Sequence, residues 1–248
     1  MIRELANPSR FMAYSGRLLP WLAGAAALAL GVGLYMTWFT APADYQQGET
    51  VRIMYLHVPA AWLSLFFYAT MAASALGTLV WRHPLADVSQ KAAAPIGAAF
   101  TFICLVTGSL WGKPMWGTYW QWDARLTSML VMLLIYLGIM ALWRAIEEPS
   151  RAARAVSILT LVGAVNVPIV KFSVDWWNTL HQPASVLKMG GPAIHPDMLV
   201  PLFLMFALFK CYFVTVLLWR MKAELNRAKI RGLEAAVQAA AERREQAA

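Results

Sequence analysis

Six segments of mainly apolar residues constrain this chain more than any other feature of its sequence. They cover residues 18–39, 58–80, 92–110, 126–142, 156–174 and 198–219. A helix needs about 20 mainly apolar residues to cross the hydrocarbon core of a bilayer. The whole chain is 60% hydrophobic and only 14% charged, which is outside the range of ordinary soluble domains. The sequence therefore predicts an all-α integral membrane protein, a bundle of six transmembrane helices.

The first and fifth segments are less regular than the others. Asn166, Pro168 and Lys171 interrupt the second half of the fifth segment. The first segment is followed by Ala41 and Ala43, which resemble the cleavage site of a secretory signal. Its apolar core is longer than the roughly 7 to 15 residues typical of such signals, so we expect it to stay as a membrane anchor.

Lysine and arginine residues lie mostly on one side of the predicted membrane. One set of flanks holds Arg3, Arg10, Arg17, Arg82, Lys91, Arg144, Arg151, Arg154, Arg220, Lys222, Arg227, Lys229, Arg231, Arg243 and Arg244. The opposite flanks hold only Arg52, Lys113, Arg125, Lys171 and Lys188. Because cytoplasmic flanks are rich in such residues, we expect both termini to be cytoplasmic, an N-in/C-in topology. The net charge of +8 is then a topology signal and does not indicate nucleic-acid binding.

This topology divides the chain into two parts. Residues 1–222 form the predicted six-span domain, and residues 223–248 form a charged tail that we expect to be a solvated cytoplasmic helix. The outer loops, at residues 40–57, 111–128 and 172–197, carry His57, His181 and His195, whereas His83 faces the cytoplasm.

The outer segment 111–128, WGKPMWGTYWQWDARLTS, gathers four tryptophans and one tyrosine. It contains too many glycines, prolines and charges to span a membrane. In either a helical or an extended conformation, Trp116 and Trp120 share one side. Three neighbouring tryptophans offer roughly 450 Å² of apolar surface, which is the size of a typical binding patch. The alternative is an interfacial aromatic belt, although belts are scattered over several helix ends.

An aromatic surface flanked by histidines predicts a large, flat, apolar ligand with a metal at its centre. Imidazole nitrogen is a good ligand for iron, and histidines commonly fill the axial positions of haem. His57 and His181 each follow or precede an aromatic cluster on the outer face, so we expect both to be ligands. A lone histidine near an interface is more often a satisfied polar residue. His195, between two prolines, fits loop structure better but stays open as a ligand.

The charged residues near the tryptophans allow several roles. Arg125 and Lys113 could bind the propionates of a haem, but Arg125 could equally pair with Asp123 or with lipid headgroups. We expect Asp123 to be an exposed carboxylate that orients the loop or contacts a partner. Lys210 lies near the middle of the sixth segment, where it could pair with another subunit or serve a transport path. Because the sequence has no GxxxxGK[ST] motif, any ATP-driven step would come from another subunit.

Several motifs together resemble one family. WGTYWQWDARLTS, MYLHVPAAW and NVPIVKFSVDWWNTLHQPAS, in this order and with six spans, are similar to the cytochrome c maturation protein C family (haem exporter protein C), a WWD-type haem-handling family. Related haem lyase subunits continue with WDP and an acidic residue, where this chain has Ala124 and Arg125. Tyr119 stands where some members have tryptophan.

The resemblance implies a protein of the bacterial inner membrane that presents haem b at the periplasmic face and passes it to the haem chaperone, the E protein. It implies axial ligation by His57 and His181. It also implies that the porphyrin is held by Trp111, Trp116, Tyr119, Trp120, Trp122, Asp123 and Arg125.

The expected partners are an ABC-type ATPase subunit (A), a second membrane subunit (B), a small D subunit and membrane lipid, without nucleic acid. The chain itself is then a delivery subunit and not an enzyme. Two alternatives remain: a haem lyase-type enzyme, and a non-haem transporter with Lys210 and Asn166 along its path.

Overall fold

A computed structural model describes residues 7–183, 185–186 and 188–246 of the chain. These residues form the helices α2 (Pro8–Tyr35), η1 (Met36–Thr40), η2 (Glu49–Ile53), α3 (Met54–Trp81), α4 (Pro84–Trp116), α5 (Ala124–Ala145), α6 (Pro149–Gly163), α7 (Asn166–Trp176) and α8 (Pro196–Gln246). Six helical stretches in this part are long and apolar enough to cross a membrane. The prediction of an all-α chain with six apolar spans is therefore confirmed, while its orientation stays a prediction.

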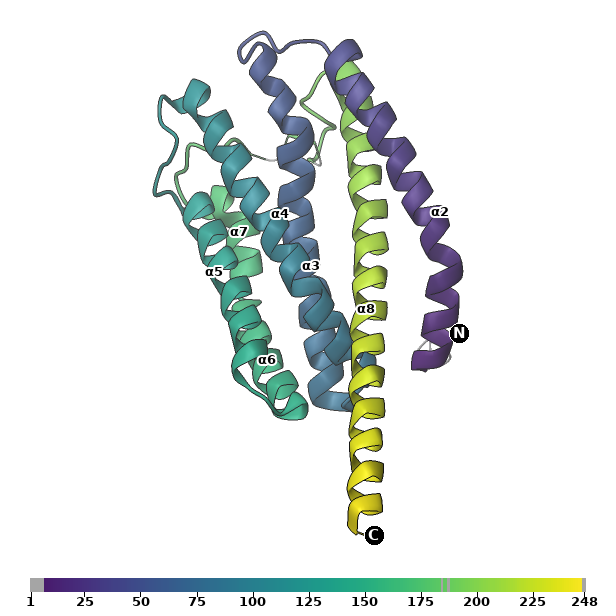
Figure 1. The fold of residues 1–248 in the computed structure, drawn as a ribbon. Helices are drawn as coiled ribbons and strands as arrows, with labels where there is room; N and C mark the ends of the chain where they lie inside the picture. The colour runs from purple at the N-terminus through teal and green to yellow at the C-terminus, as the bar shows by residue number, and fades with distance from the viewer. Residues whose placement is uncertain (1–6, 184, 187, 247–248) are drawn as a thin grey trace.

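The helices form an elongated bundle around α3 and α4 (Figure 1). These two helices pack against each other, α5 packs on α4, and α6 and α7 lie against α5. Helix α8 packs against α3 and α4 and carries α2 along its other side. The described N-terminal end of α2 and the end of α8 lie at one end of the bundle. We call the opposite end, where α3 and α5 begin, the site end.

Two tyrosines fix the helices that build the site. The Tyr136 hydroxyl on α5 donates to the Ser64 carbonyl on α3 at 2.7 Å, and the Tyr68 hydroxyl on α3 donates to the Thr160 carbonyl on α6 at 3.0 Å. Both rings are fully buried. Tyr136 lies so close to Gly97 on α4 that an added Cβ would be 2.3 Å from its ring. These contacts hold α3, α4, α5 and α6 together in the core.

The fifth span is two helices with a break between them. Helix α6 ends at Gly163 and α7 begins at Asn166, as the interruption of the fifth segment suggested. The buried Asn166 amide donates to the Ser128 carbonyl on α5 at 2.8 Å, which satisfies its polar group within the bundle. Pro168 lies in the first turn of α7, where backbone N–H groups have no carbonyl partner within the helix, so the missing N–H of proline costs no hydrogen bond there. Helix α7 continues the fifth span beyond the break.

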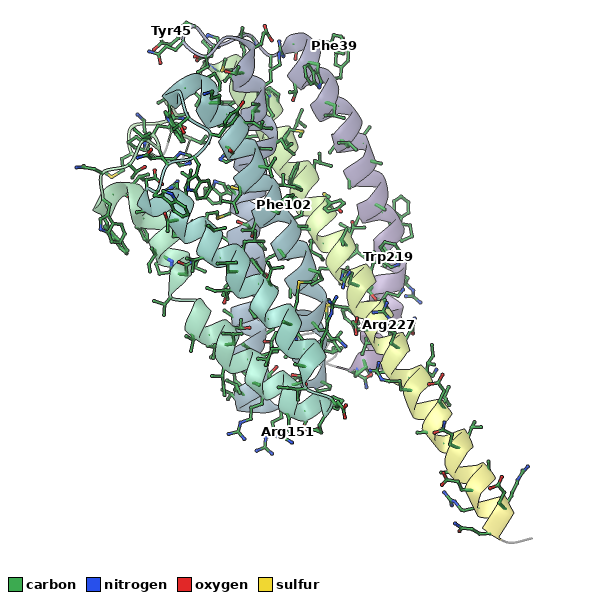
Figure 2. The ribbon with its side chains drawn as sticks, turned by 60° about the vertical axis from the view of Figure 1, so that its left-hand side comes forward. Phe39, Tyr45, Phe102, Arg151, Trp219 and Arg227 are labelled. Carbon is green, nitrogen blue, oxygen red and sulfur yellow. The ribbon has the colours of Figure 1, made fainter. Side chains whose placement is uncertain are left out.

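Helix α8 runs without interruption for 51 residues, a length of about 77 Å at 1.5 Å per residue. It leaves the bundle near Arg227, and the rest of the helix is solvent-exposed (Figure 2). At that point the buried Glu224 pairs with Lys91 of α4 at 3.0 Å and with Arg227 at 2.8 Å. The predicted boundary at residues 222–223 lies inside this helix and stays a prediction. Arg3, Ala247 and Ala248, which the sequence placed in the terminal flank and tail, lie outside the described residues.

Candidate functional site

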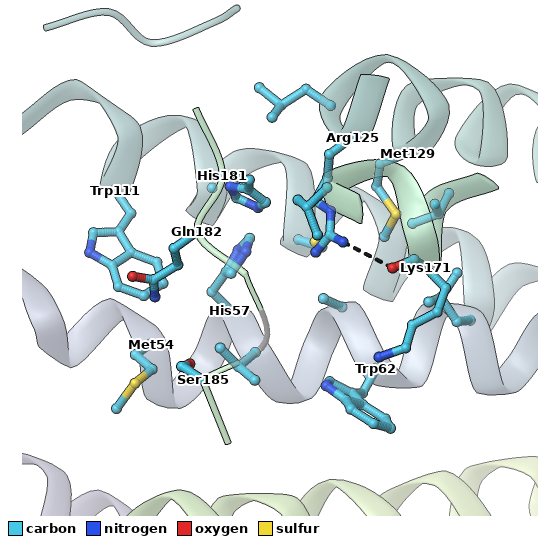
Figure 3. Close-up of a pocket in the computed structure, with 18 of the residues that line it drawn as sticks. Met54, His57, Trp62, Trp111, Arg125, Met129, Lys171, His181, Gln182 and Ser185 are labelled. Atoms are coloured by element: carbon cyan, nitrogen blue, oxygen red, sulfur yellow. Dashed lines mark hydrogen bonds between the residues drawn. The ribbon is translucent and has the colours of Figure 1, made fainter. Parts of the chain in front are cut away.

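Two of the three outer histidines meet at the site end (Figure 3). His57 lies in the first turns of α3, and His181 lies in the loop between α7 and α8. Their ring centroids are 6.3 Å apart and their planes are nearly perpendicular, at 88°. The Trp111 ring contacts the His57 ring edge-on, with 5.7 Å between the ring centroids. The Trp116 ring contacts the His181 ring in the same way, with 5.4 Å between the centroids. Residues far apart in the sequence thus form one aromatic and imidazole cluster.

His57 is buried against α4, with only 7% of its surface exposed. Its Nδ1 lies 3.0 Å from the Thr107 hydroxyl oxygen. Its ring also lies over Gly108, where an added Cβ would come within 2.9 Å of Cε1. Glycine at this position therefore permits the close approach of the imidazole to the helix.

His181 is held by a loop that folds back over the end of α4. Its backbone N–H donates to the Thr179 hydroxyl at 2.8 Å. Burial lowers the pKa of His181 to about 4, the positive charges of Arg125 and of a protonated His57 act in the same direction, and Asp123 opposes them. At neutral pH the imidazole is therefore uncharged, and one ring nitrogen keeps a lone pair for a metal.

A cavity of about 470 Å³ extends from the two histidines along the face of α3. This volume is within the range of small-molecule sites. Most of its wall is apolar and comes from α3, α4, α5 and α7, including Met54, Val58, Ala61, Leu105, Met129 and Val170. The cavity can therefore take a large apolar ligand with the imidazoles at one end.

Positive groups line the α7 side of the same cavity. The Arg125 guanidinium donates from Nε to the Ser173 hydroxyl at 3.0 Å and from Nη2 to the Lys171 carbonyl at 3.1 Å. Lys171 Nζ lies 5.0 Å from the centre of the Trp62 ring, across from α7 on α3. The Asp175 carboxylate lines the same side of the cavity, so these three side chains together carry one net positive charge, which suits a ligand with a carboxylate.

The tryptophan-rich segment is not a single loop. Helix α4 continues through Pro114 to Trp116 and ends at Gly117, whose φ of 74° is the left-handed conformation that closes many helices. Trp111 and Trp116 line the cavity. Tyr119, Trp120 and Trp122 lie in the irregular part and are not among its described lining residues.

The outer part of this segment remains an aromatic surface. Trp120 and Trp122 contact each other edge-on at 5.3 Å. Trp122 is 73% exposed and Tyr119 is 55% exposed. Lys113 donates to the Gly117 carbonyl at 2.9 Å and lies over the Tyr119 ring, so it stabilises the end of α4 and does not line the cavity.

The expectation that Asp123 is an exposed carboxylate is wrong. Its side chain is buried, and Oδ1 accepts the Leu126 N–H at 2.8 Å as the N-cap of α5. Oδ2 has no hydrogen-bond partner in the described part of the chain. Asp123 therefore sets where α5 begins, one residue before Ala124.

The remaining histidines lie apart from the cavity. His195 is exposed, and its Nδ1 lies 3.7 Å from Asp197 at the start of α8. His83 accepts the Leu85 N–H as the N-cap of α4, at the opposite end of the bundle. Within the described residues, no group of three His, Cys, Asp or Glu side chains could hold a bare metal ion. Two imidazoles suit a metal whose other positions are filled by a planar macrocycle.

The spacing of the two imidazoles leaves room for a metal between them. Their ring centroids are 6.3 Å apart, and a bond from a histidine nitrogen to zinc is about 2.0 Å long, so two ring nitrogens turned toward each other could bind one metal.

Some contributors to the site were missed by the sequence analysis. Thr107 and Gly108 contact His57, and Trp111 donates through Nε1 to the Gln47 side chain at 2.9 Å. An added Cβ at Gly112 would lie 2.8 Å from the Trp116 ring. The GxxxG spacing of Gly108 and Gly112 in an apolar run is a signal of close packing that could have found them.

Comparisons with known proteins show which family the chain belongs to. The family model described as "Heme exporter protein C" matches residues 1–236. A heme exporter protein C of Bradyrhizobium diazoefficiens is 62% identical over 231 residues, which cover 93% of this chain and 88% of the relative. The heme exporter protein C of Escherichia coli K12 is 52% identical over 201 residues, which cover 81% of this chain and 81% of the relative. That of Paracoccus denitrificans is 44% identical over 233 residues, which cover 94% of this chain and 96% of the relative. The chain therefore belongs to the heme exporter protein C family.

Proposed function

We propose that this protein holds haem b between His57 and His181 and delivers it to a haem chaperone for cytochrome c maturation. The observation that carries the proposal is the pair of facing imidazoles, 6.3 Å apart, at the end of an apolar cavity. The names of the relatives support a role in haem export. When bound, haem supplies the iron and the planar macrocycle.

The residues of the chain then perform separate tasks. His57 and His181 hold the metal through neutral ring nitrogens. Trp111 and Trp116 cover the imidazoles and exclude water, and Arg125 and Lys171 are the cations nearest to the cavity for the propionates. Tyr119 and Trp122 are exposed next to the site, with the half-buried Trp120 packed against Trp122, and this aromatic surface is suited to contact with the chaperone.

The proposed arrangement in the cell follows from the charge asymmetry of the sequence. The site end faces the periplasm and both termini face the cytoplasm, in the inner membrane of a bacterium. ATP hydrolysis is performed by an ABC-type partner (A), which acts with a second membrane subunit (B) and a small D subunit. The chain is a transport and delivery subunit and has no catalytic turnover of its own.

An absorption spectrum of the purified protein, taken with and without reductant, tests the proposal. We expect a haem b spectrum with two histidine ligands. His57→Ala and His181→Ala should each weaken binding and shift the bands. His83→Ala, at the opposite end of the bundle, is the matched control and should leave both unchanged. Purified protein that takes up no haem, or loss of the spectrum in His195→Ala but not in His181→Ala, would refute this assignment.

A further inference from the structure

The Thr107 hydroxyl can donate its hydrogen to only one of its three polar neighbours. It lies 2.7 Å from the Ile103 carbonyl and 3.3 Å from the Cys104 carbonyl, both on the preceding turn of α4, and 3.0 Å from His57 Nδ1. A hydroxyl has a single hydrogen, and a carbonyl oxygen can only accept. The hydrogen of Thr107 therefore goes to Ile103, and the oxygen of Thr107 accepts the hydrogen of His57 Nδ1.

This pattern determines the tautomer of His57. A neutral imidazole that carries its hydrogen on Nδ1 has its lone pair on Nε2. We propose that Thr107 is a positioning residue that holds His57 in the Nδ1–H tautomer and so presents Nε2 to the haem iron. The inference rests on the proposed function. It adds a residue that itself contacts neither the iron nor, in the described cavity, the ligand.

Two further observations support a fixed imidazole. His57 is almost fully buried, so an unpartnered Nδ1–H would have no water to bind. Gly108, the residue after Thr107, lets the ring lie against α4. The hydrogen bond and the close packing together leave the ring one orientation. A partner on the second nitrogen also makes a metal-bound imidazole more basic.

The test compares Thr107→Val with Thr107→Ser in the full-length protein. Valine keeps the shape of threonine without the hydroxyl, whereas serine keeps the hydroxyl. We expect Thr107→Val to weaken haem binding by about 10- to 100-fold, as loss of such a partner typically does. The reduction potential of the bound haem should rise, because a less basic ligand stabilises ferric iron less. Thr107→Ser should restore both values toward those of the original protein.

Nitrogen-15 NMR of the haem-free protein gives an independent measurement. It should show the hydrogen of His57 on Nδ1, with loss of this preference in Thr107→Val. If the original protein binds haem and Thr107→Val changes neither the potential nor the tautomer, Thr107 is only a packing residue. If the original protein takes up no haem, the proposed function fails, and the NMR result alone decides the tautomer.

Lys210 supports a second inference that does not depend on haem. Its side chain is exposed on α8, in line with the exposed Ala207 and Phe203 on the same face. At 1.5 Å per residue, Lys210 is about 20 Å from Asp197 and about 15 Å from Arg220 along the helix. The lysine stem is much shorter than either distance, so the ammonium cannot reach a membrane surface.

The Lys210 charge has no oppositely charged partner in the described part of the chain. Lys210 makes no ion pair or hydrogen bond with any residue that the structure describes. None of the 13 Asp and Glu residues lies within any of the six apolar segments. A second copy of this chain therefore cannot supply a carboxylate at that depth. Charges in the middle of a membrane normally face a partner.

We infer that this face of α8 binds a transmembrane helix of a different subunit, which presents a carboxylate to Lys210. A photo-crosslinking amino acid in place of Ala207 should join that helix in the native membrane, whereas one in place of the exposed Leu28 on α2 is the control. The crosslinked peptide should be apolar and contain Asp or Glu. Lys210→Arg should keep the crosslink and Lys210→Glu should abolish it, and changing the partner's acid to lysine should restore it. Crosslinks to lipid alone, or equal yields in all Lys210 variants, would overturn the inference.

Discussion

Replacing Gly108 with alanine separates the stability of the bundle from the geometry of the site. The new methyl carbon would lie 2.9 Å from His57 Cε1 and 3.5 Å from Nδ1. Carbon atoms in good contact are about 3.5 to 4.0 Å apart, so the imidazole must move by at least about 0.6 Å. Because His57 is a proposed ligand of the haem iron, this movement should impair ligation.

The same substitution should not destabilise the helix. Alanine is favoured over glycine in a helix interior by about 1 kcal/mol, which offsets part of the clash. We expect an unfolding midpoint close to that of the original protein and a haem affinity about 10- to 100-fold lower. That factor corresponds to about 1.4 to 2.8 kcal/mol of binding free energy. Thermal unfolding of the haem-free protein and a haem titration measure the two effects separately.

Gly31→Ala on α2 is the matched control, because an added Cβ there meets no atom within 4 Å. It should leave haem binding unchanged. Equal haem affinity for Gly108→Ala and Gly31→Ala, with an unchanged spectrum, would show that the position of His57 over α4 does not matter for binding.

Further predictions concern pH, the aromatic surface, Asp123 and topology. Because the pKa of His181 is lowered to about 4, haem affinity should stay level from neutral pH to about pH 5 and fall near pH 4. The fold should lose stability as the pH falls from about 6.5 to about 4, because His181 binds a proton in the unfolded state over this range but not in the folded state. Haem titration measures the affinity and thermal unfolding measures the stability across this pH range, with His195→Ala as the control. Trp122→Ala, at a residue 73% exposed, should leave the haem spectrum nearly intact but reduce covalent transfer of haem to a co-expressed chaperone; normal transfer would exclude a hand-over role. Asp123→Ala should cost about 1 kcal/mol of stability through loss of the N-cap, whereas Asp123→Asn should retain most of it in thermal unfolding. Reporter fusions at Gly48, Gly117 and Gly190 should report a periplasmic location, and those at Pro84 and Pro149 a cytoplasmic one. A cytoplasmic signal at Gly117 would contradict the proposal that the site end faces the periplasm.

The helices were predictable from the sequence because apolar length alone limits what can cross a bilayer. The break before Asn166 lies where the polar residues of the fifth segment indicated an irregular span. The burial of Asp123 was not, because an N-cap and an exposed loop carboxylate have the same sequence context until the start of α5 is known. Likewise, Thr107 and Gly108 contact His57 only after α3 and α4 pack at a given register. Local patterns therefore predicted the two histidines, and the helix contacts supplied the residues around them.

The two histidines are attached to parts of the molecule that differ in their local stability. His57 lies on a core helix with Thr107 and Gly108 against it, whereas His181 lies in a loop whose later part contains two glycines, Gly190 and Gly191, in positive-φ conformations. Loops open locally at a much lower free energy than core helices. We therefore expect the loop that carries His181 to open at a lower free energy than the helix that carries His57. Amide hydrogen exchange should accordingly be faster around His181 than around His57.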